Sequence, residues 1–122
     1  MEQTEFLEKN IFTDLKNLND GPDKETVHVF SESDFETLLQ RVEHFGIGVY
    51  QIETSLNGEV SAVATHEDLK KKATDPKWYN KAFLTFKTRN PGLSYAATYK
   101  VSNKLLAKSD TLDSEEVEDV KE

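Results

Sequence analysis

Basic and aromatic side chains are interleaved through residues 70–100, a combination suited to binding single-stranded nucleic acid. The segment holds eight basic residues, and six aromatic residues lie among them. Proteins that bind single strands need cations to neutralise the phosphates and flat rings on which the bases stack. The candidate nucleic-acid-binding residues are Lys70, Lys71, Lys72, Lys77, Lys81, Lys87, Arg89 and Lys100.

The same aromatic residues also fit a second interpretation, in which they belong to the core. On a helical wheel of residues 76–88, Trp78, Phe83 and Phe86 lie on the face opposite the lysines. They would then pack in the core, and the lysines would form an ordinary solvated surface that pairs with acidic parts of the chain. The sequence favours this interpretation, and it predicts that Trp78 and Phe83 are buried.

Acidic and basic residues are separated along the chain, which carries a net charge of −8. Residues 1–69 hold 15 acidic and 4 basic residues, residues 70–100 hold one acidic and 8 basic residues, and residues 101–122 hold 7 acidic and 3 basic residues. This layout indicates either internal charge pairing or one face that attracts anions. If the basic segment binds nucleic acid, the acidic C-terminal residues compete for it.

The acidic N-terminal part suggests a different function. Carboxylates spread over a helix can imitate a phosphate backbone and inhibit a nucleic-acid-binding protein by occupying its groove. Acidic proteins are also common because net charge keeps them soluble, and the sequence favours that simpler reason. The first candidates for mimicry are Glu2, Glu5, Glu8, Asp14, Asp20, Asp23 and Glu25.

No spacing in the chain is typical of a catalytic or metal site. His28, His44 and His66 are not three or four residues apart, and there is no cysteine, whereas zinc needs three or four converging ligands. Gly46-Ile-Gly48 lacks the third glycine of a phosphate-binding loop and precedes an expected strand. We therefore expect no catalytic residue, no metal and no cofactor, and a protein that is not an enzyme.

An amphipathic helix is expected over Thr4–Leu18. Asp20-Gly21-Pro22 should end it, because glycine can adopt a left-handed conformation and proline cannot continue a helix. The apolar stripe of this helix is the expected protein-docking surface, since a hinge over residues 20–23 would join it to the rest of the chain. The stripe consists of Leu7, Ile11, Leu15 and Leu18.

Two longer helical patterns and a short one follow. Ser33 and Glu36 form a capping box before an apolar series that runs to Phe45, where Gly46 should end the helix. Residues 67–73 form a short helical pattern that Thr65 is expected to cap. The last helix spans residues 76–88, with Asp75 as its N-cap and proline in its first position.

Four extended segments complete the pattern. They are residues 26–30, 47–55, 59–64 and 93–101, and Asn57-Gly58 between the middle two predicts a hairpin. The inner order is therefore β-α-β-β-α-β, which is that of a ferredoxin-like fold with an antiparallel sheet. RNA-recognition domains of that topology stack bases on aromatic residues of their first and third strands, and the expected strands here do not carry that aromatic signature.

The expected organisation is an α+β protein in three parts. Residues 1–20 form the N-terminal amphipathic helix, residues 21–108 form the α+β domain, and residues 109–122 form an acidic tail with the composition of disorder. The N-terminus does not resemble a secretory signal and no apolar run is long enough to span a bilayer, so a cytoplasmic protein without membrane contact is expected.

Three functions remain after the sequence alone. The preferred one is a small, acidic, non-enzymatic regulatory protein that acts by binding another protein. The alternative is single-strand nucleic-acid binding through residues 70–100, and the second alternative is an acidic inhibitor that mimics nucleic acid. No family resemblance distinguishes them, and the oligomeric state is open.

Overall fold

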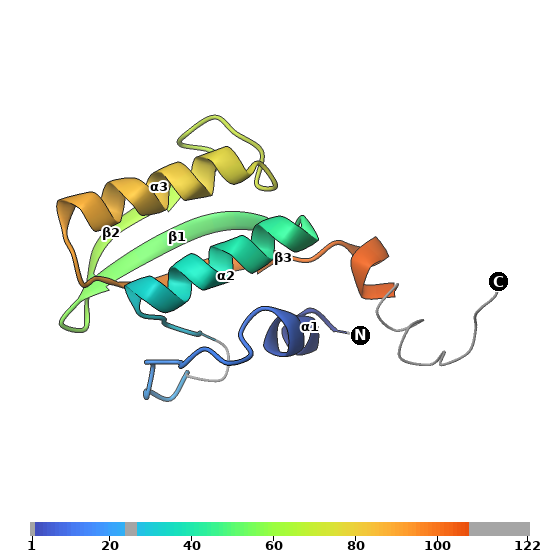
Figure 1. Ribbon diagram of the computed structural model, residues 1–122, viewed down its shortest axis with the longest axis horizontal. Helices are drawn as coiled ribbons and strands as arrows, with labels where there is room; N and C mark the ends of the chain where they lie inside the picture. The colour runs from blue at the N-terminus through green and yellow to red at the C-terminus, as the bar shows by residue number, and fades with distance from the viewer. Residues whose placement is uncertain (1, 24–26, 108–122) are drawn as a thin grey trace.

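The computed structural model describes residues 2–23 and 27–107, which fold into helices and an antiparallel sheet (Figure 1). Helical residues 103–107 end the described chain, and the predicted tail, 109–122, lies outside it. Within the described ranges, no helix combines the length and apolar character needed to cross a bilayer. The elements are α1 (Gln3–Asn10), α2 (Glu32–Phe45), β1 (Gly48–Leu56), β2 (Glu59–Thr65), α3 (Pro76–Arg89) and β3 (Ser94–Lys100).

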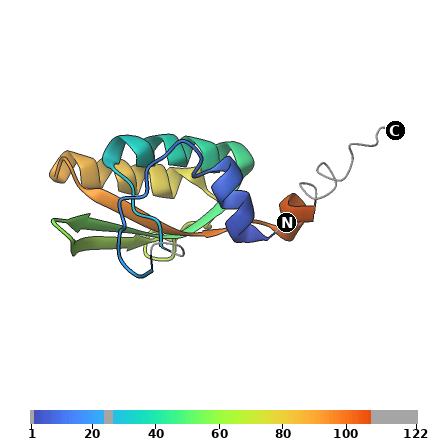
Figure 2. The ribbon, with the colours of Figure 1, turned by 90° about the horizontal axis from the view of Figure 1, so that it is seen from below.

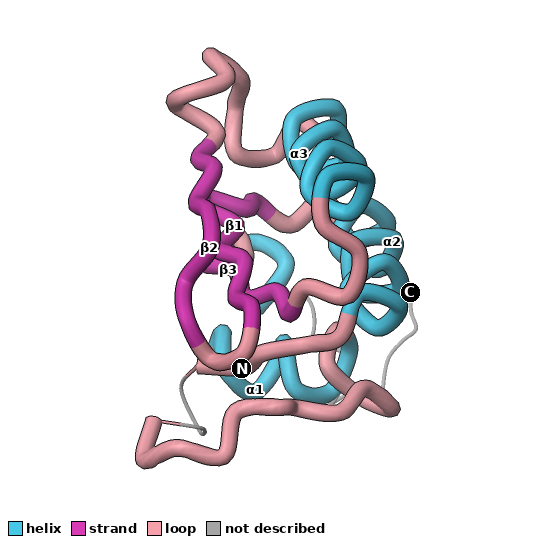
Figure 3. Tube along the Cα trace, turned by 90° about the vertical axis from the view of Figure 1, so that its left-hand side faces the viewer, coloured by secondary structure: helices cyan, strands magenta, loops and turns pink. Residues whose placement is uncertain are grey.

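The described strands form one sheet in the order β2-β1-β3, and both pairings are antiparallel. Helices α2 and α3 lie side by side on one face of this sheet (Figure 2). Figure 3 shows the strands and this helix pair as two layers, with α1 at one end of both. Among the described helices, none covers the opposite face of the sheet.

The hairpin between β1 and β2 is confirmed. Asn57 and Gly58 both have positive φ angles, 54° and 85°, which fit the tight two-residue turn that joins twisted antiparallel strands. Leu56 and Glu59 are paired across the turn. A register shift further along places one extra β2 residue, Ser61, opposite the step from Thr54 to Ser55.

The expected first strand is reduced to a single bridge, and the four-stranded ferredoxin-like sheet is not confirmed. Phe30 alone pairs with Tyr95 of β3, and residues 24–26 lie outside the described chain. The backbone groups of the preceding residue face away from β3 and bond to the N-terminal loop instead of to a further strand. The Val29 N–H donates to the Asn17 side chain at 2.9 Å, and the Val29 carbonyl accepts from the Leu18 N–H at 2.7 Å.

The N-terminal helix is shorter than the sequence suggests. It ends at Asn10 rather than Leu18, and Asp14 in the following loop has a positive φ of 70°. Apolar periodicity continues past the helix because Ile11 is fully buried and Leu15 packs against the core from the loop. A spacing of four therefore marked residues that share a core, not residues that share one helix.

The ends of the other helices agree with the predicted signals, apart from one cap. Gly46 ends α2 in the left-handed conformation, and Asp75 caps α3 ahead of Pro76. The N-cap of α2 is Ser31 instead of Ser33, because the Ser31 hydroxyl accepts from the Asp34 N–H at 3.3 Å. Residues 67–73 form turns without a helix, although the Thr65 hydroxyl does accept from the Asp68 N–H at 3.0 Å.

The core lies between the sheet and the helix pair. The wheel of α3 is confirmed, since Trp78 and Phe83 are 1% and 5% exposed, whereas Leu84 outside the apolar arc is 57% exposed. Tyr95 of β3 stacks on Phe35 of α2, with ring centroids 5.0 Å apart. Its ring also meets Phe83 edge-on at 5.0 Å, so one strand residue joins both helices to the sheet.

Candidate functional site

The predicted docking stripe of the N-terminal helix faces inward. Leu7 and Ile11 are 5% and 0% exposed and belong to the main core, Leu15 is partly buried against it, and Leu18 is exposed. The Gln3 side chain also fixes α1 to the sheet end, because its amide donates to the Tyr99 carbonyl at 3.0 Å. Apart from Leu18, the stripe is therefore occupied by the protein's own core and is not a free docking surface.

The basic segment and its aromatic residues separate in space. Trp78, Tyr79, Phe83 and Tyr95 are buried, so their rings are not available for stacking on bases. Lys87 is held at the surface of the helix pair, 3.8 Å from Glu36 and 5.1 Å from the Phe83 ring centroid.

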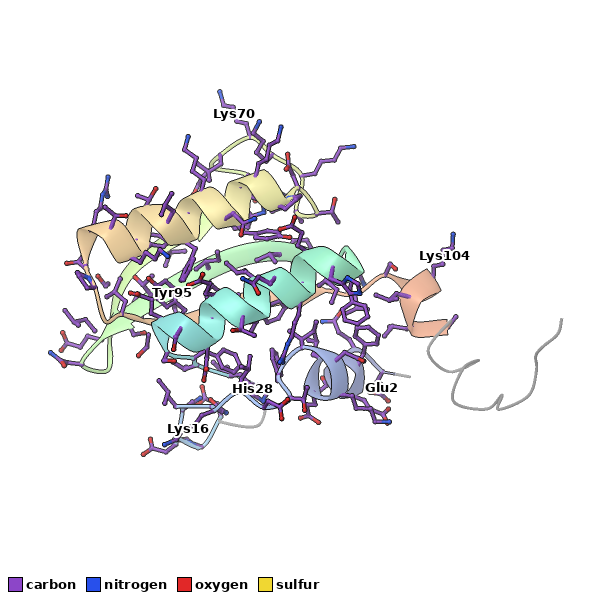
Figure 4. The ribbon with its side chains drawn as sticks, in the orientation of Figure 1. Glu2, Lys16, His28, Lys70, Tyr95 and Lys104 are labelled. Carbon is purple, nitrogen blue, oxygen red and sulfur yellow. The ribbon has the colours of Figure 1, made fainter. Side chains whose placement is uncertain are left out.

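Among the cations, five lysines form a first group. Lys70, Lys71 and Lys72 lie on the exposed loop before α3, and Lys77 and Lys81 follow on exposed positions one helical turn apart. Figure 4 shows Lys70 pointing away from the body on this side of the molecule. Lys100 lies at the end of β3, but Arg89 lies at the other end of α3, so the structure does not join all eight cations into one patch.

An apolar groove lies beside the first group of lysines, between β2 and α3. Its volume is about 180 Å³, and two of its apolar side chains are well exposed, Val63 at 47% and Leu69 at 38%. We call it the β2–α3 groove. Its lining residues are Val63, Ala64, Leu69, Lys81, Ala82, Thr85 and Phe86.

The groove is bordered by a free strand edge. In the described part of the chain, β2 pairs with β1 alone, so its outer edge carries unpaired backbone N–H and C=O groups. Residues 60–65 hold no charged residue, although 31% of the chain is charged, and Val60 is 60% exposed. Charged residues and proline usually protect such an edge from other strands. In β2 the pairing is interrupted only by the bulge at Ser61, and residues 62–65 pair with β1 in regular register.

The histidines do not assemble a site. His28 stacks on Phe12 with ring centroids 4.4 Å apart, and burial lowers its pKa against the opposing influence of Glu8. The Nδ1 of His66 lies 2.8 Å from the Lys71 carbonyl, and His44 is exposed on α2. Among the described residues, no group of three or more histidines and carboxylates is placed to hold a metal ion.

The carboxylates proposed to mimic nucleic acid do not share one helix surface. Glu5 and Glu8 lie on α1, where Glu5 pairs with Lys9 at 3.7 Å, and Asp14 belongs to the following loop. The others of the described set, Glu2, Asp20 and Asp23, lie before or after these elements, and Glu25 lies outside the described chain.

Comparison with protein-family models found no match, and neither the curated proteins nor the solved structures contain one that is significantly similar to this chain. The groove and the free edge therefore carry the functional argument by themselves. Sequence reasoning missed this site because it assigned Val63 and Leu69 to no common surface. The available signal was the uncharged segment 60–65 in a strongly charged chain.

Proposed function

We propose that this chain is a non-enzymatic protein-binding module, which takes up an extended acidic segment of a partner protein along the outer edge of β2. The observation that carries the proposal is the apolar β2–α3 groove next to an unpaired, uncharged strand edge. The binding mode is strand addition, in which backbone hydrogen bonds supply affinity and pockets for alternate side chains supply specificity.

The size of the groove favours a peptide side chain over a small molecule. Pockets for drug-sized ligands usually have volumes of about 300–1,000 Å³. The β2–α3 groove, at about 180 Å³, is smaller, and Val63, Leu69 and Phe86 make it apolar. An extended peptide paired with β2 would place every second side chain on the groove side, so that one apolar side chain of the peptide fills it.

The charge around the groove favours an acidic partner. Lys81 lines the groove, and Lys77 and the loop of Lys70, Lys71 and Lys72 lie near it in the chain, where these five lysines outnumber Glu67 and Asp68, the two acids before Leu69. A second copy of this protein paired edge to edge would bring the same cations toward these, and like charges across an interface are unfavourable. An acidic segment instead gains charge complementarity.

The burial of aromatic side chains favours protein over nucleic acid as the partner. Single-strand binders depend on exposed rings for stacking. Trp78, Tyr79, Phe83 and Tyr95 are at most 5% exposed. Among the large aromatic residues of the described chain, Tyr50 is the one with substantial exposure, at 41%. The test below therefore measures an oligonucleotide as the alternative ligand.

The test is binding of a fluorescent ten-residue peptide of alternating valine and glutamate to the full chain, measured by anisotropy. We expect saturable binding that weakens with added salt, and little binding of a matched valine–lysine peptide or of an oligothymidine. Val63→Asp should weaken binding about tenfold, because it places a carboxylate at the groove.

Leu84→Asp is the matched control, because Leu84 is exposed on α3 but lies outside the groove. Lys81→Glu and Lys104→Glu form a second pair, inside and outside the groove. Equal binding of the acidic and basic peptides, or equal losses in the control variants, would contradict the proposal. Tighter binding of the oligothymidine, lost in Lys81→Glu, would favour nucleic acid.

A further inference from the structure

The C-terminal segment of this chain has the chemistry that the β2–α3 groove requires. Residues 109–122 hold seven acidic residues and one lysine. Three apolar residues, Leu112, Val117 and Val120, are spaced among the acids. The segment lies outside the described residues, so its relation to the groove has to be argued from charge, length and the place where the described chain ends.

The last strand leaves the sheet close to the basic loop. The Val49 N–H at the start of β1 donates to the Ala73 carbonyl at 2.9 Å. A Cβ atom on the neighbouring Gly48 would lie 3.4 Å from the Ala73 side chain and 3.6 Å from the Lys100 carbonyl. The end of β3 and the residue that follows Lys70, Lys71 and Lys72 therefore both pack against the start of β1.

The remaining chain is long enough to return to the groove. Val117 and Val120 follow Ala107, the last described residue, by 10 and 13 residues, and chains of those lengths span at most about 35 and 45 Å when extended. A compact domain of about 100 residues has a radius of gyration of about 13 Å. Reach is therefore not limiting, and a tether of this kind holds a ligand at an effective concentration of about a millimolar.

We infer that residues 109–122 are an intramolecular ligand of the β2–α3 groove, with the acids paired to the lysines around Lys77 and Lys81 and an apolar residue in the groove. The inference rests on the proposed function, because it names the chain's own C-terminal segment as the first occupant of the same site. A partner then has to displace the segment, so the tail sets a threshold for partner binding.

The test compares two charge-neutralised forms of the full chain. In the tail variant, five acids of residues 109–122 become amides: Asp113, Glu115, Glu116, Glu118 and Asp119. In the matched control, five acids of the N-terminal part become amides: Glu2, Glu5, Glu8, Asp14 and Asp20. Methyl NMR signals of Val63 and Leu69 report the groove, and the valine–glutamate peptide reports its availability.

We expect the tail variant to shift both methyl signals and to bind the peptide about tenfold more tightly, and the control to do neither. Added salt should move the wild-type methyl signals toward those of the tail variant, because it screens the ion pairs. Shifts that depend on protein concentration would show a tail from a second copy and would contradict the intramolecular form.

The two proposals fail separately in this experiment. If both variants keep the wild-type methyl signals and peptide affinity while Val63→Asp still weakens peptide binding about tenfold, the tail inference is wrong and the proposed function stands. If no form binds the peptide but the tail variant shifts Val63 and Leu69, the tail occupies the groove and the proposed partner chemistry is wrong.

Discussion

Tyr95 and Tyr99 carry hydroxyl groups that are buried and make no hydrogen bond to any described residue. Burial raises the pKa of Tyr95 to about 12, with Glu32 adding to the effect, and burial also raises the pKa of Tyr99. Tyr79 has a raised pKa for the same first reason, with further contributions from Glu43 and Asp75. The rings of these tyrosines pack as apolar groups in the core. Burial also removes their hydroxyl groups from water, and this desolvation opposes folding.

Replacing Tyr95 with phenylalanine should therefore leave stability at pH 7 unchanged or raise it by up to about 1 kcal/mol, because an unsatisfied buried hydroxyl is removed. An unfolded tyrosine ionises near pH 10, whereas folded Tyr95 ionises only near 12. The wild type should thus lose stability as the pH rises from 10 to 12, and Tyr95→Phe should lose less. Urea unfolding at pH 7 and pH 11 measures both, and a loss of more than about 1 kcal/mol at pH 7 would show a hydroxyl contact that matters.

Trp78 tests the core assignment of the aromatic residues. Its side chain is 1% exposed, so Trp78→Ala should cost about 3–5 kcal/mol in the free energy of unfolding. Leu84→Ala on the same helix should cost much less, because Leu84 is 57% exposed. Denaturant unfolding of the two variants checks this. Readily quenched, red-shifted tryptophan emission from the native wild type would contradict the assignment.

At the scale of elements, local signals predicted what lies within one helix or hairpin. Gly46, Asn57-Gly58 and Asp75-Pro76 all mark boundaries that the structure confirms, since each depends on the conformation of one or two residues. The predicted strand over 26–30 is reduced to the Phe30 bridge, and the backbone of Val29 bonds on its other side to Asn17 and Leu18 of the N-terminal loop. A local sequence pattern does not contain these contacts with the N-terminal loop.

The cap of α2 provides a prediction at this scale. Ser31→Ala should lower the free energy of unfolding by about 1 kcal/mol, because the Ser31 hydroxyl accepts the Asp34 N–H. Ser33→Ala, at the position that the capping box suggested, should have a smaller effect, since its hydroxyl lies 3.5 Å from the Ser31 hydroxyl and accepts no backbone N–H of the described chain. Thermal unfolding of both variants ranks them, and the reverse order would restore the sequence-based cap.

At the scale of the whole molecule, the acidic and basic blocks of the sequence lie in different parts of the structure. Lys81 lines the β2–α3 groove and the other lysines of α3's first turns and of the loop before it lie near it in the chain, whereas most of the described acids lie on α1, the N-terminal loop and α2. The sequence revealed the charge blocks, but not the groove, because Val63 and Leu69 meet Phe86 only through the packing of β2 under α3. For the same reason, the sequence did not show that the N-terminal docking stripe is covered, because only the fold buries Leu7 and Ile11 in the core.

The tail should contribute little to folding even if it occupies the groove. Exposed ion pairs are worth about 0–1 kcal/mol each at most, and they are screened by salt. A tenfold competition for the groove corresponds to about 1.4 kcal/mol. Deleting residues 109–122 should therefore lower Tm by no more than about 6–11 °C, since 1 kcal/mol corresponds to about 4–8 °C in a domain of this size. Calorimetry of the two forms measures it, and a larger drop would show that the tail packs into the core.

The most direct test of the central claim is amide hydrogen exchange of β2 in the full chain, with and without the valine–glutamate peptide. The claim predicts that amides of residues 60–65 on the outer edge gain protection when the peptide is added, because the peptide supplies the missing strand, and that α1 amides do not change. Unchanged exchange throughout β2 at a saturating peptide concentration, or protection gained at α1 instead, would contradict it.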